Sequence, residues 1–269
     1  MLYNYFYKPE PEIQHRNESK YHTFGVEVEV DDGHDRDQLV YELDQLNLPI
    51  YQKTDGSLHY SGVEIISHPG SLLWHMYTMR WAEVFRLCRK FGYDSDKTTT
   101  CGLHIHVGRA TLGRTRQQRL ATAAKLVLLT DALWDKGLVK FTRRFSGELN
   151  NWAPRPHIPA AMKLYTQLHG DDAAIRLALD AGGQDGDHDD RYTAVNLTND
   201  STVEFRIFKG TLKRERLIAS MQLVDTLIHY AMKHSVEDCC EVEWADVMEY
   251  DDHGSSYKEL VKYNASLGL

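Results

Sequence analysis

A stretch near the N-terminus, TFGVEVEV at residues 23–30, alternates between apolar residues and threonine, glycine or glutamate. Side chains alternate along a β-strand, so a strand here carries four apolar residues on one face and Glu27 and Glu29 on the other. The two carboxylates then lie about 6.6 Å apart. Carboxylates this close resist joint ionisation unless water or a cation screens them. The stretch therefore predicts either the solvated face of an edge strand or a strand that helps to bind a cation.

Three later segments with strand-like alternation repeat this combination of one apolar face and one charged face. The charged residue of GVEIIS is Glu64, and both His104 and His106 lie on the same face of GLHIHVG. In TVEFRIF, Glu204 shares its face with Arg206. An antiparallel sheet that aligned these faces would gather the charges on one polar floor, which costs free energy unless a cation neutralises the carboxylates. Each segment alone is also consistent with a solvated strand face, but their coincidence favours a metal site.

The ligand types indicate which metal such a floor would bind. Carboxylates combined with one or two imidazoles suit Mg²⁺ or Mn²⁺. No cysteine belongs to the group, which argues against a structural zinc ion there. The four cysteines of the chain form no CxxC pair. Reduced thiols in a cytoplasmic protein are their simplest explanation.

The order of helical and strand patterns predicts an α+β fold. Two hairpins are expected, one with a turn at Asp55–Gly56 and one joining RYTAVNLTND to STVEFRIFKG. Because the strands come in hairpins with helices between them, the sheet should be antiparallel rather than doubly wound and parallel. Helical spacing begins near Asp37 and recurs at residues 71–93, 114–134, 160–170, 171–182 and 213–235.

The chain is expected to form a single domain over residues 1–269, because it has no internal repeat and no low-complexity linker. Residues 1–20 are interpreted as a weakly structured leader and residues 236–269 as a mostly helical tail. Residues 182–190, rich in glycine and aspartate, are interpreted as a mobile loop that closes over bound nucleotide. The formal net charge of -8 gives no general basic field for nucleic acid, and no apolar run approaches a membrane span.

Two features bear on phosphate binding. The segment GRATLGRT resembles a phosphate-binding loop, but Arg114 replaces its lysine and the expected sheet is not parallel, so a connecting loop is the preferred interpretation. Arginines offer another route, since a guanidinium forms paired hydrogen bonds with phosphate oxygens. The candidates are Arg143, Arg144, Arg191 and Arg206. Arg143 and Arg144 are equally consistent with surface charge at a helix end, whereas strand alternation sets Arg206 beside a glutamate.

The chain resembles the amidoligase family, within the carboxylate–amine ligase superfamily of glutamine synthetase and glutamate–cysteine ligase. Five segments carry the resemblance in this order: FGVEVEV, KTDGSL…GVEIIS, CGLHIHVG, RYTAVNL and TVEFRIFKGTL. They span roughly residues 23–212 and leave the leader and the tail uncovered. The resemblance implies a glutamine-synthetase-like antiparallel sheet, curved around the site, with helices packed on one side.

The resemblance also implies roles for individual residues. Arg206 would contact phosphate, and Arg191 and Asn196 would contact nucleotide or substrate. Arg143 is a further candidate for nucleotide binding. The implied metal ligands are Glu27, Glu29, Glu64, His104 and Glu204.

The implied reaction is the ATP-dependent formation of an amide or peptide-like bond. The γ-phosphoryl group of ATP would pass to a substrate carboxylate, and an amine would displace phosphate from the acyl phosphate. Arg206 would stabilise the transferring group, and Asp55 would hold or deprotonate the amine unless it is only a turn residue. The partners would be small-molecule or peptide carboxylates and amines. Two alternatives stay open, a metal-dependent hydrolase that uses the same Glu/His face and a binding protein without catalysis.

Overall fold

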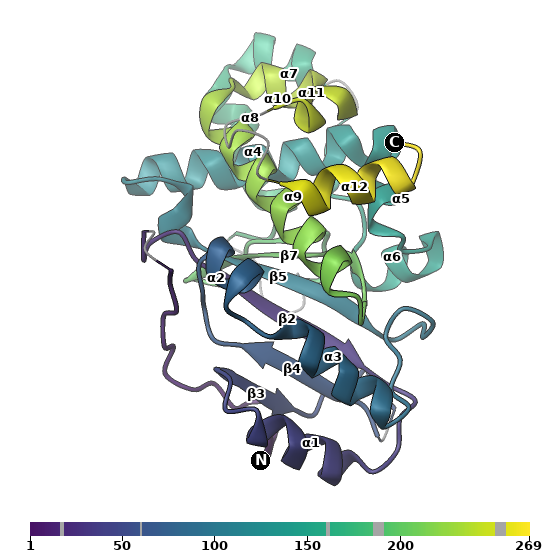
Figure 1. Cartoon of the computed structure of the whole chain (residues 1–269). Helices are drawn as coiled ribbons and strands as arrows, with labels where there is room; N and C mark the ends of the chain where they lie inside the picture. Colours follow the sequence, from purple (N-terminus) through teal and green to yellow (C-terminus); the bar gives the residue numbers. More distant parts are fainter. Residues whose placement is uncertain (17–18, 60, 160–161, 185–190, 251–256) are drawn as a thin grey trace.

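A seven-stranded sheet forms the centre of the protein (Figure 1). The computed structural model describes residues 1–16, 19–59, 61–159, 162–184, 191–250 and 257–269. The strands are β1 (Leu2–Tyr3), β2 (Phe24–Val30), β3 (Ile50–Lys53), β4 (Val63–Ser67), β5 (Gly102–Gly108), β6 (Val195–Asn196) and β7 (Thr202–Lys209). They lie in the order β1-β3-β4-β2-β5-β7-β6. The four strands predicted to carry charged faces, β4, β2, β5 and β7, are therefore consecutive neighbours, and each adjacent pair is antiparallel.

The sheet is mixed rather than wholly antiparallel, because β1 pairs with β3 in the parallel direction. The prediction of a weakly structured leader is therefore wrong for β1. The backbone amide of Thr54 donates to the carbonyl of Tyr3 (3.0 Å), and the rings of Tyr3 and Tyr7 stack with centroids 3.6 Å apart. A strand of two residues has too little alternation to be recognised from sequence. The α+β class and the antiparallel pairing of the other strands agree with the prediction.

Helices cover one face of the sheet and also gather beyond its β7 end. In Figure 1, α2, α3 and the first part of α9 lie over the sheet, α1 lies along its lower edge beside β3, and α4, α7, α8, α10 and α11 lie together beyond the opposite edge. The helices are α1 (Arg36–Gln45), α2 (Leu72–Tyr77), α3 (Trp81–Lys90), α4 (Arg116–Leu133), α5 (Val139–Thr142), α6 (Ser146–Trp152), α7 (Met162–His169), α8 (Asp171–Ala181), α9 (Arg214–Lys233), α10 (Val236–Glu241), α11 (Trp244–Met248) and α12 (Lys258–Ser266). Among the described residues, no helix has the length and apolar character needed to cross a membrane.

The single helix expected at residues 71–93 is two helices, α2 and α3. The hydroxyl of Ser71 accepts a hydrogen bond from the amide of Trp74 (3.1 Å) and begins α2. The chain leaves helical geometry after Tyr77 and resumes it at Trp81. Met79, between the two helices, is only 4% exposed. The break between the two helices therefore leaves the apolar side chain of Met79 in the core.

The apolar face of β2 is buried as the alternation predicts. Phe24, Val26, Val28 and Val30 have no exposed surface, and they share the core with Trp81 of α3. Burial of such side chains stabilises the fold by about 1.5–3 kcal/mol each. Because the apolar face is held against the helices, the charged face of the strand must turn the other way.

A β-bulge interrupts the pairing of β5 with β7. Leu103 lies opposite Phe208 but Ile105 lies opposite Phe205, so β7 has one extra residue in this interval. The extra residue shifts the alternation, and Phe205 and Phe208 are both buried, at 1% and 2% exposure. Bulges bend a strand and re-aim its side chains. Arg206 lies inside the bulged interval, so simple alternation does not hold beyond it.

His75 predicts a measurable acid sensitivity of the fold. It is fully buried, its Nε2 donates to the carbonyl of Phe24 (3.0 Å), and burial lowers its pKa from 6.5 to about 4. Between these values the unfolded chain takes up a proton that the folded protein excludes, so stability falls as the pH falls. The loss attributable to His75 should reach about 3 kcal/mol.

Chemical denaturation of the wild type and His75→Gln at pH 7 and pH 4 measures this loss. Glutamine keeps a side-chain donor but does not titrate. Between pH 7 and pH 4 the free energy of unfolding of the wild type should therefore fall by more than that of the variant. Equal losses in both proteins would show that His75 does not contribute.

Candidate active site

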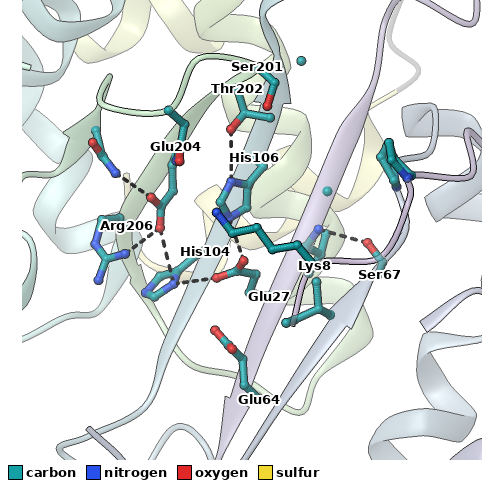
Figure 2. A pocket seen from close by; sticks show the side chains of 18 of the residues that line it. Lys8, Glu27, Glu64, Ser67, His104, His106, Ser201, Thr202, Glu204 and Arg206 are labelled. Atoms are coloured by element: carbon teal, nitrogen blue, oxygen red, sulfur yellow. Dashed lines mark hydrogen bonds and ion pairs between the residues drawn. The ribbon is translucent and has the colours of Figure 1, made fainter. Parts of the chain in front are cut away.

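A cavity of about 850 Å³ lies against the charged face of the sheet (Figure 2). Side chains of β2, β3, β4, β5 and β7 line it, together with N-terminal residues such as Tyr5, Phe6 and Lys8. The predicted site residues that line it are Glu27, Glu29, Asp55, Glu64, His104, Arg191, Asn196, Glu204 and Arg206. The fold thus brings together residues from positions far apart in the sequence. Arg143 is not among the lining residues.

The sheet register sets the charged side chains in neighbouring positions. The directly opposed pairs are Glu29 with Glu64, Glu27 with His104, and His106 with Glu204. Side chains opposed in this way have Cβ atoms about 4.5–5.5 Å apart. A slip of one residue would move them to the apolar face. The burial that fixes the core therefore also fixes the composition of the cavity floor.

Glu27, His104 and Glu204 form a first group of candidate metal ligands (Figure 2). Nδ1 of His104 lies 3.4 Å from Oε2 of Glu27 and 3.6 Å from Oε1 of Glu204. One ligand atom from each of the three residues lies within 4.8 Å of the others. Nε2 of His106 lies 3.1 Å from Oε1 of Glu27, close enough to help orient this carboxylate. The spacing allows the three residues to hold one cation.

Glu29, Glu64 and His104 form a second group with ligand atoms within the same 4.8 Å. Nε2 of His104 lies 4.0 Å from Oε1 of Glu29. His104 thus stands between the two groups, with one ring nitrogen toward each. A neutral imidazole has only one unprotonated nitrogen. His104 can therefore bind a cation in one group while its N–H donates to a carboxylate of the other.

Compensating positive charge is unevenly distributed over the floor. Burial alone would raise the pKa of Glu27, but the charge of His106 and the hydrogen bond with His104 hold it well below its usual range. Burial also opposes ionisation of Glu204, yet the guanidinium of Arg206 lowers the pKa of this carboxyl. For Glu64, burial and the negative charge of Glu27 raise the pKa well above its usual range. A nearby cation would therefore favour the ionised form of Glu64.

The polar atoms around the second group fit a cation. Oε2 of Glu64 is buried and accepts no hydrogen bond from the described residues, although Nζ of Lys53 lies 3.3 Å away. The amide of Gly102 donates to Oε2 of Glu29, and a Cβ at this glycine would lie 2.9 Å from Nε2 of His104. Only glycine allows the backbone to approach this closely. Carboxylate oxygens with one imidazole are a donor set that suits Mg²⁺ or Mn²⁺.

Two arginines border the carboxylates. Nη1 of Arg206 donates to Oε1 of Glu204 (2.5 Å), and its guanidinium lies 5.7 Å from the ring centre of Tyr192. Arg144 is 3% exposed and donates to the backbone carbonyl of Arg206. The Nε atoms of both arginines are buried and have no hydrogen-bond partner among the described residues. Unpaired buried donors cost free energy, so an anionic ligand that reached them would recover it.

Arg144 rather than the predicted Arg143 reaches the cavity. Arg143 ends α5 in the left-handed conformation, with φ of 58°, and its side chain is exposed. Burial raises the pKa of Tyr263, and the charges of Arg216 and Arg143 oppose this shift. The turn at Arg143 directs the next residue inward. Two adjacent arginines at a helix end carry no periodic signal that could have separated them.

Asn196 and Asp55 line the cavity, but each already has a protein partner. Nδ2 of Asn196 donates to Oε2 of Glu204 (2.7 Å), so it positions that carboxylate. Asp55 accepts hydrogen bonds from the amide (2.6 Å) and the hydroxyl (2.5 Å) of Ser57. The bond from the amide two residues later is typical of an Asx turn. The turn role of Asp55 is therefore present, while its position in the cavity leaves a contact with substrate available.

Arg191 connects the N-terminal segment to the cavity. Its guanidinium donates to the hydroxyls of Tyr5 (2.6 Å) and Tyr192 (2.9 Å). Lys53 also donates to the carbonyl of Tyr5 (3.4 Å). The N-terminal residues were not predicted to line the site, because they carry no alternation and no motif. Of the predicted lid at 182–190, residues 185–190 lie outside the described residues.

The segment GRATLGRT forms a connection between β5 and α4. Oε1 of Gln118 accepts from the amides of Arg114 (3.0 Å) and Thr115 (3.1 Å), and Thr115 caps α4 in return. These amides are thereby used to begin the helix. The interpretation as a connecting loop agrees with this geometry.

Comparison with known proteins gives one family match. The model of the family described as "Putative amidoligase enzyme" matches residues 51–228, more than half of the chain. The matched part includes Glu64, His104, Glu204 and Arg206, whereas Glu27 and Glu29 precede it. No curated protein sequence shows significant similarity to the chain.

Proposed function

The chain belongs to the amidoligase family, and from this premise we propose that it is an ATP-dependent carboxylate–amine ligase. The observation that carries the proposal is the floor of carboxylates and imidazoles with Arg206 beside it in one cavity. The same family match gives no support to the alternative of a metal-dependent hydrolase. A glutamine-synthetase-like curvature of the sheet is part of the proposal, and the antiparallel run β4-β2-β5-β7 supports it.

The metal ligands in this proposal come from the two groups on the floor. They are Glu27, Glu29, Glu64, His104 and Glu204, which would hold one or two Mg²⁺ or Mn²⁺ ions. When bound, the metal neutralises negative charge on the nucleotide phosphates. His106 and Asn196 would orient Glu27 and Glu204, respectively, through the contacts described above.

The proposed reaction has two steps. A carboxylate oxygen of the acid attacks the γ-phosphorus of ATP, the bond to the bridging oxygen breaks, and ADP leaves. The amine nitrogen then attacks the carbonyl carbon of the acyl phosphate, inorganic phosphate leaves, and the nitrogen loses a proton. Arg206 would donate hydrogen bonds to the phosphoryl oxygens in the first step, which stabilises the charge that develops there. Asp55 would hold the amine or accept its proton.

The proposal is tested by the products formed from ATP. The protein is incubated with Mg²⁺, ATP and pools of carboxylic acids and amines, and ADP and phosphate are measured. ADP release that needs both an acid and an amine, together with an amide product in the mass spectrum, is expected. Hydrolysis of an amide without ATP would instead favour the hydrolase.

Adjacent arginines provide a matched pair for the nucleotide subsite. Arg144→Lys should lower the rate of ADP release by about 10- to 100-fold, because a buried charged donor loses its fork of hydrogen bonds. Arg143→Lys should leave the rate nearly unchanged, since this side chain is exposed outside the cavity. Steady-state kinetics of both variants check the expectation. Equal losses in both would place the phosphate contact elsewhere.

A further inference from the structure

A second cluster of ligand-type side chains lies outside the cavity, where the segment before β2 meets α9. Asp225 and His229 are one turn apart on α9, and His22 joins them from far along the chain. Nε2 of His22 lies 2.6 Å from Oδ1 of Asp225, and Nδ1 of His229 lies 3.5 Å from Oδ2. The imidazole rings are nearly parallel, with centroids 5.4 Å apart. One ligand atom from each residue lies within 4.8 Å of the others.

The surroundings of Asp225 resemble those of a metal-binding carboxylate. Its side chain is 2% exposed, and the hydroxyl of Tyr257 donates to Oδ2. Nδ1 of His229 donates to the backbone carbonyl of Asp225 (2.9 Å), which fixes the ring in place and leaves Nε2 as the nitrogen of this ring that can bind an ion. Outer hydrogen bonds of this kind orient the ligands of protein metal sites. The side chains of His22 and His229 are 30% and 19% exposed, so an ion can reach the cluster from solvent.

We propose that His22, Asp225 and His229 bind Zn²⁺, with water at the fourth position. Two imidazoles and one carboxylate are a zinc donor set, and the imidazole share disfavours Mg²⁺. Binding of the ion would release the proton between Nε2 of His22 and Oδ1 of Asp225 to solvent, and these atoms, now 2.6 Å apart, would separate to make bonds of about 2.0–2.2 Å to the metal. Its two positive charges would also compensate the buried carboxylate of Asp225.

A similar-looking group at Asp31, Asp32 and His59 differs in the donors that it uses. The carboxylate of Asp31 accepts from the amides of Asp32 (2.9 Å) and His59 (3.0 Å) and from the hydroxyl of Thr100 (2.9 Å). Backbone amides cannot give up their protons to a metal, so this carboxylate is already satisfied by fixed donors. Nδ1 of His59 also lies 3.0 Å from Asp31, but backbone amides donate to both oxygens of that carboxylate. The contacts named above for Asp225 are with imidazole and phenol groups, and an imidazole proton can be displaced.

The proposed ion has a structural role next to the cavity. Tyr21 and Thr23 line the cavity, whereas His22 between them does not. Zinc at His22 would fasten this segment to α9 and hold one end of the cavity lining. None of its ligands lies in the cavity, so the proposal is independent of the ligase activity.

Zinc titration of the full chain tests the site, with affinity measured by calorimetry and Zn²⁺-dependent thermal unfolding. The measurements use the Glu27→Gln background, which weakens zinc binding in the cavity. Changes to outer partners alone lower metal affinity by about 10- to 100-fold, so loss of a ligand in His22→Asn should cost about 100-fold or more. Tyr257→Phe should cost about tenfold. The matched control is His34→Asn, which removes an exposed histidine beside Asp35 and should keep full affinity.

A second measurement keeps the test independent of folding defects. Co²⁺ should give a d–d absorption band in the same background that weakens in both His22→Asn and His229→Asn. Circular dichroism without metal confirms that each variant is folded. Zinc affinity unchanged in both histidine variants, or no zinc binding in the Glu27→Gln protein, would overturn the proposal.

Discussion

Replacing Arg206 with lysine should lower turnover by about 100-fold or more, the scale of losing one preorganised donor. Arg206 lies beside Glu204 with its Nε atom buried and without a hydrogen-bond partner among the described residues. Lysine keeps the charge but loses the planar fork that matches phosphoryl oxygens. Nucleotide affinity and melting temperature should change little, because the contact matters chiefly in the transition state.

The competing role of Arg206 is a salt bridge that only holds Glu204. In that case stability and metal affinity should fall, while turnover at saturating metal stays near normal. ADP release, nucleotide affinity and melting temperature of the one variant separate the two roles. Arg155→Lys is a suitable control, because Arg155 pairs with Asp131 and Asp135 outside the cavity.

Mg²⁺ or Mn²⁺ should raise the melting temperature of the wild type, and Glu27→Gln should remove most of that rise. Stabilisation by a ligand of the folded state is about 2.7 kcal/mol at a concentration 100 times its dissociation constant. Glu27 contributes an ionised carboxylate to the first ligand group, and glutamine offers only a neutral oxygen. Thermal unfolding with and without the metal measures the difference within each protein, which cancels any effect of the substitution on the metal-free fold.

The Asp31, Asp32 and His59 group supplies the control for metal binding. Asp32→Asn alters a comparable group on the protein surface, where the Asp32 side chain is 59% exposed. Its metal-induced rise in melting temperature should equal that of the wild type. A rise that survives Glu27→Gln but disappears in Asp32→Asn would move the metal site away from the cavity.

Strand alternation was sufficient to predict most of the cavity floor. Glu27 and Glu29 could be assigned to one face of β2 because the opposite face is apolar at every second position, and the same reasoning applied to His104 and Glu204. The pairing Lys53 with Glu64 was also accessible, since β3 and β4 were predicted as a hairpin. The pairing was not predicted, because only a short turn fixes the register of a hairpin and the connection from Lys53 to Val63 is long.

Other parts of the site depend on backbone geometry that has no sequence period. Arg144 points inward because Arg143 adopts a left-handed conformation. Asn196 donates to Glu204 because the short edge strand β6 pairs with β7 and sets the two residues opposite each other. The contribution of Tyr5 depends on the parallel pairing of β1 with β3. Each of these contacts is decided by tertiary pairing, which local patterns do not encode.

The bulge in β7 has a consequence for insertions and deletions. In β2 and β5 the gain or loss of one residue would exchange the apolar and charged faces and remove every ligand beyond that point. In β7, deletion of Ile207 would instead remove the bulge and restore plain alternation, and Phe205 and Phe208, then two positions apart, would both stay on the apolar face. A strand that carries a bulge can therefore lose one residue there without exchanging its faces, whereas β2 and β5 cannot lose one inside the strand.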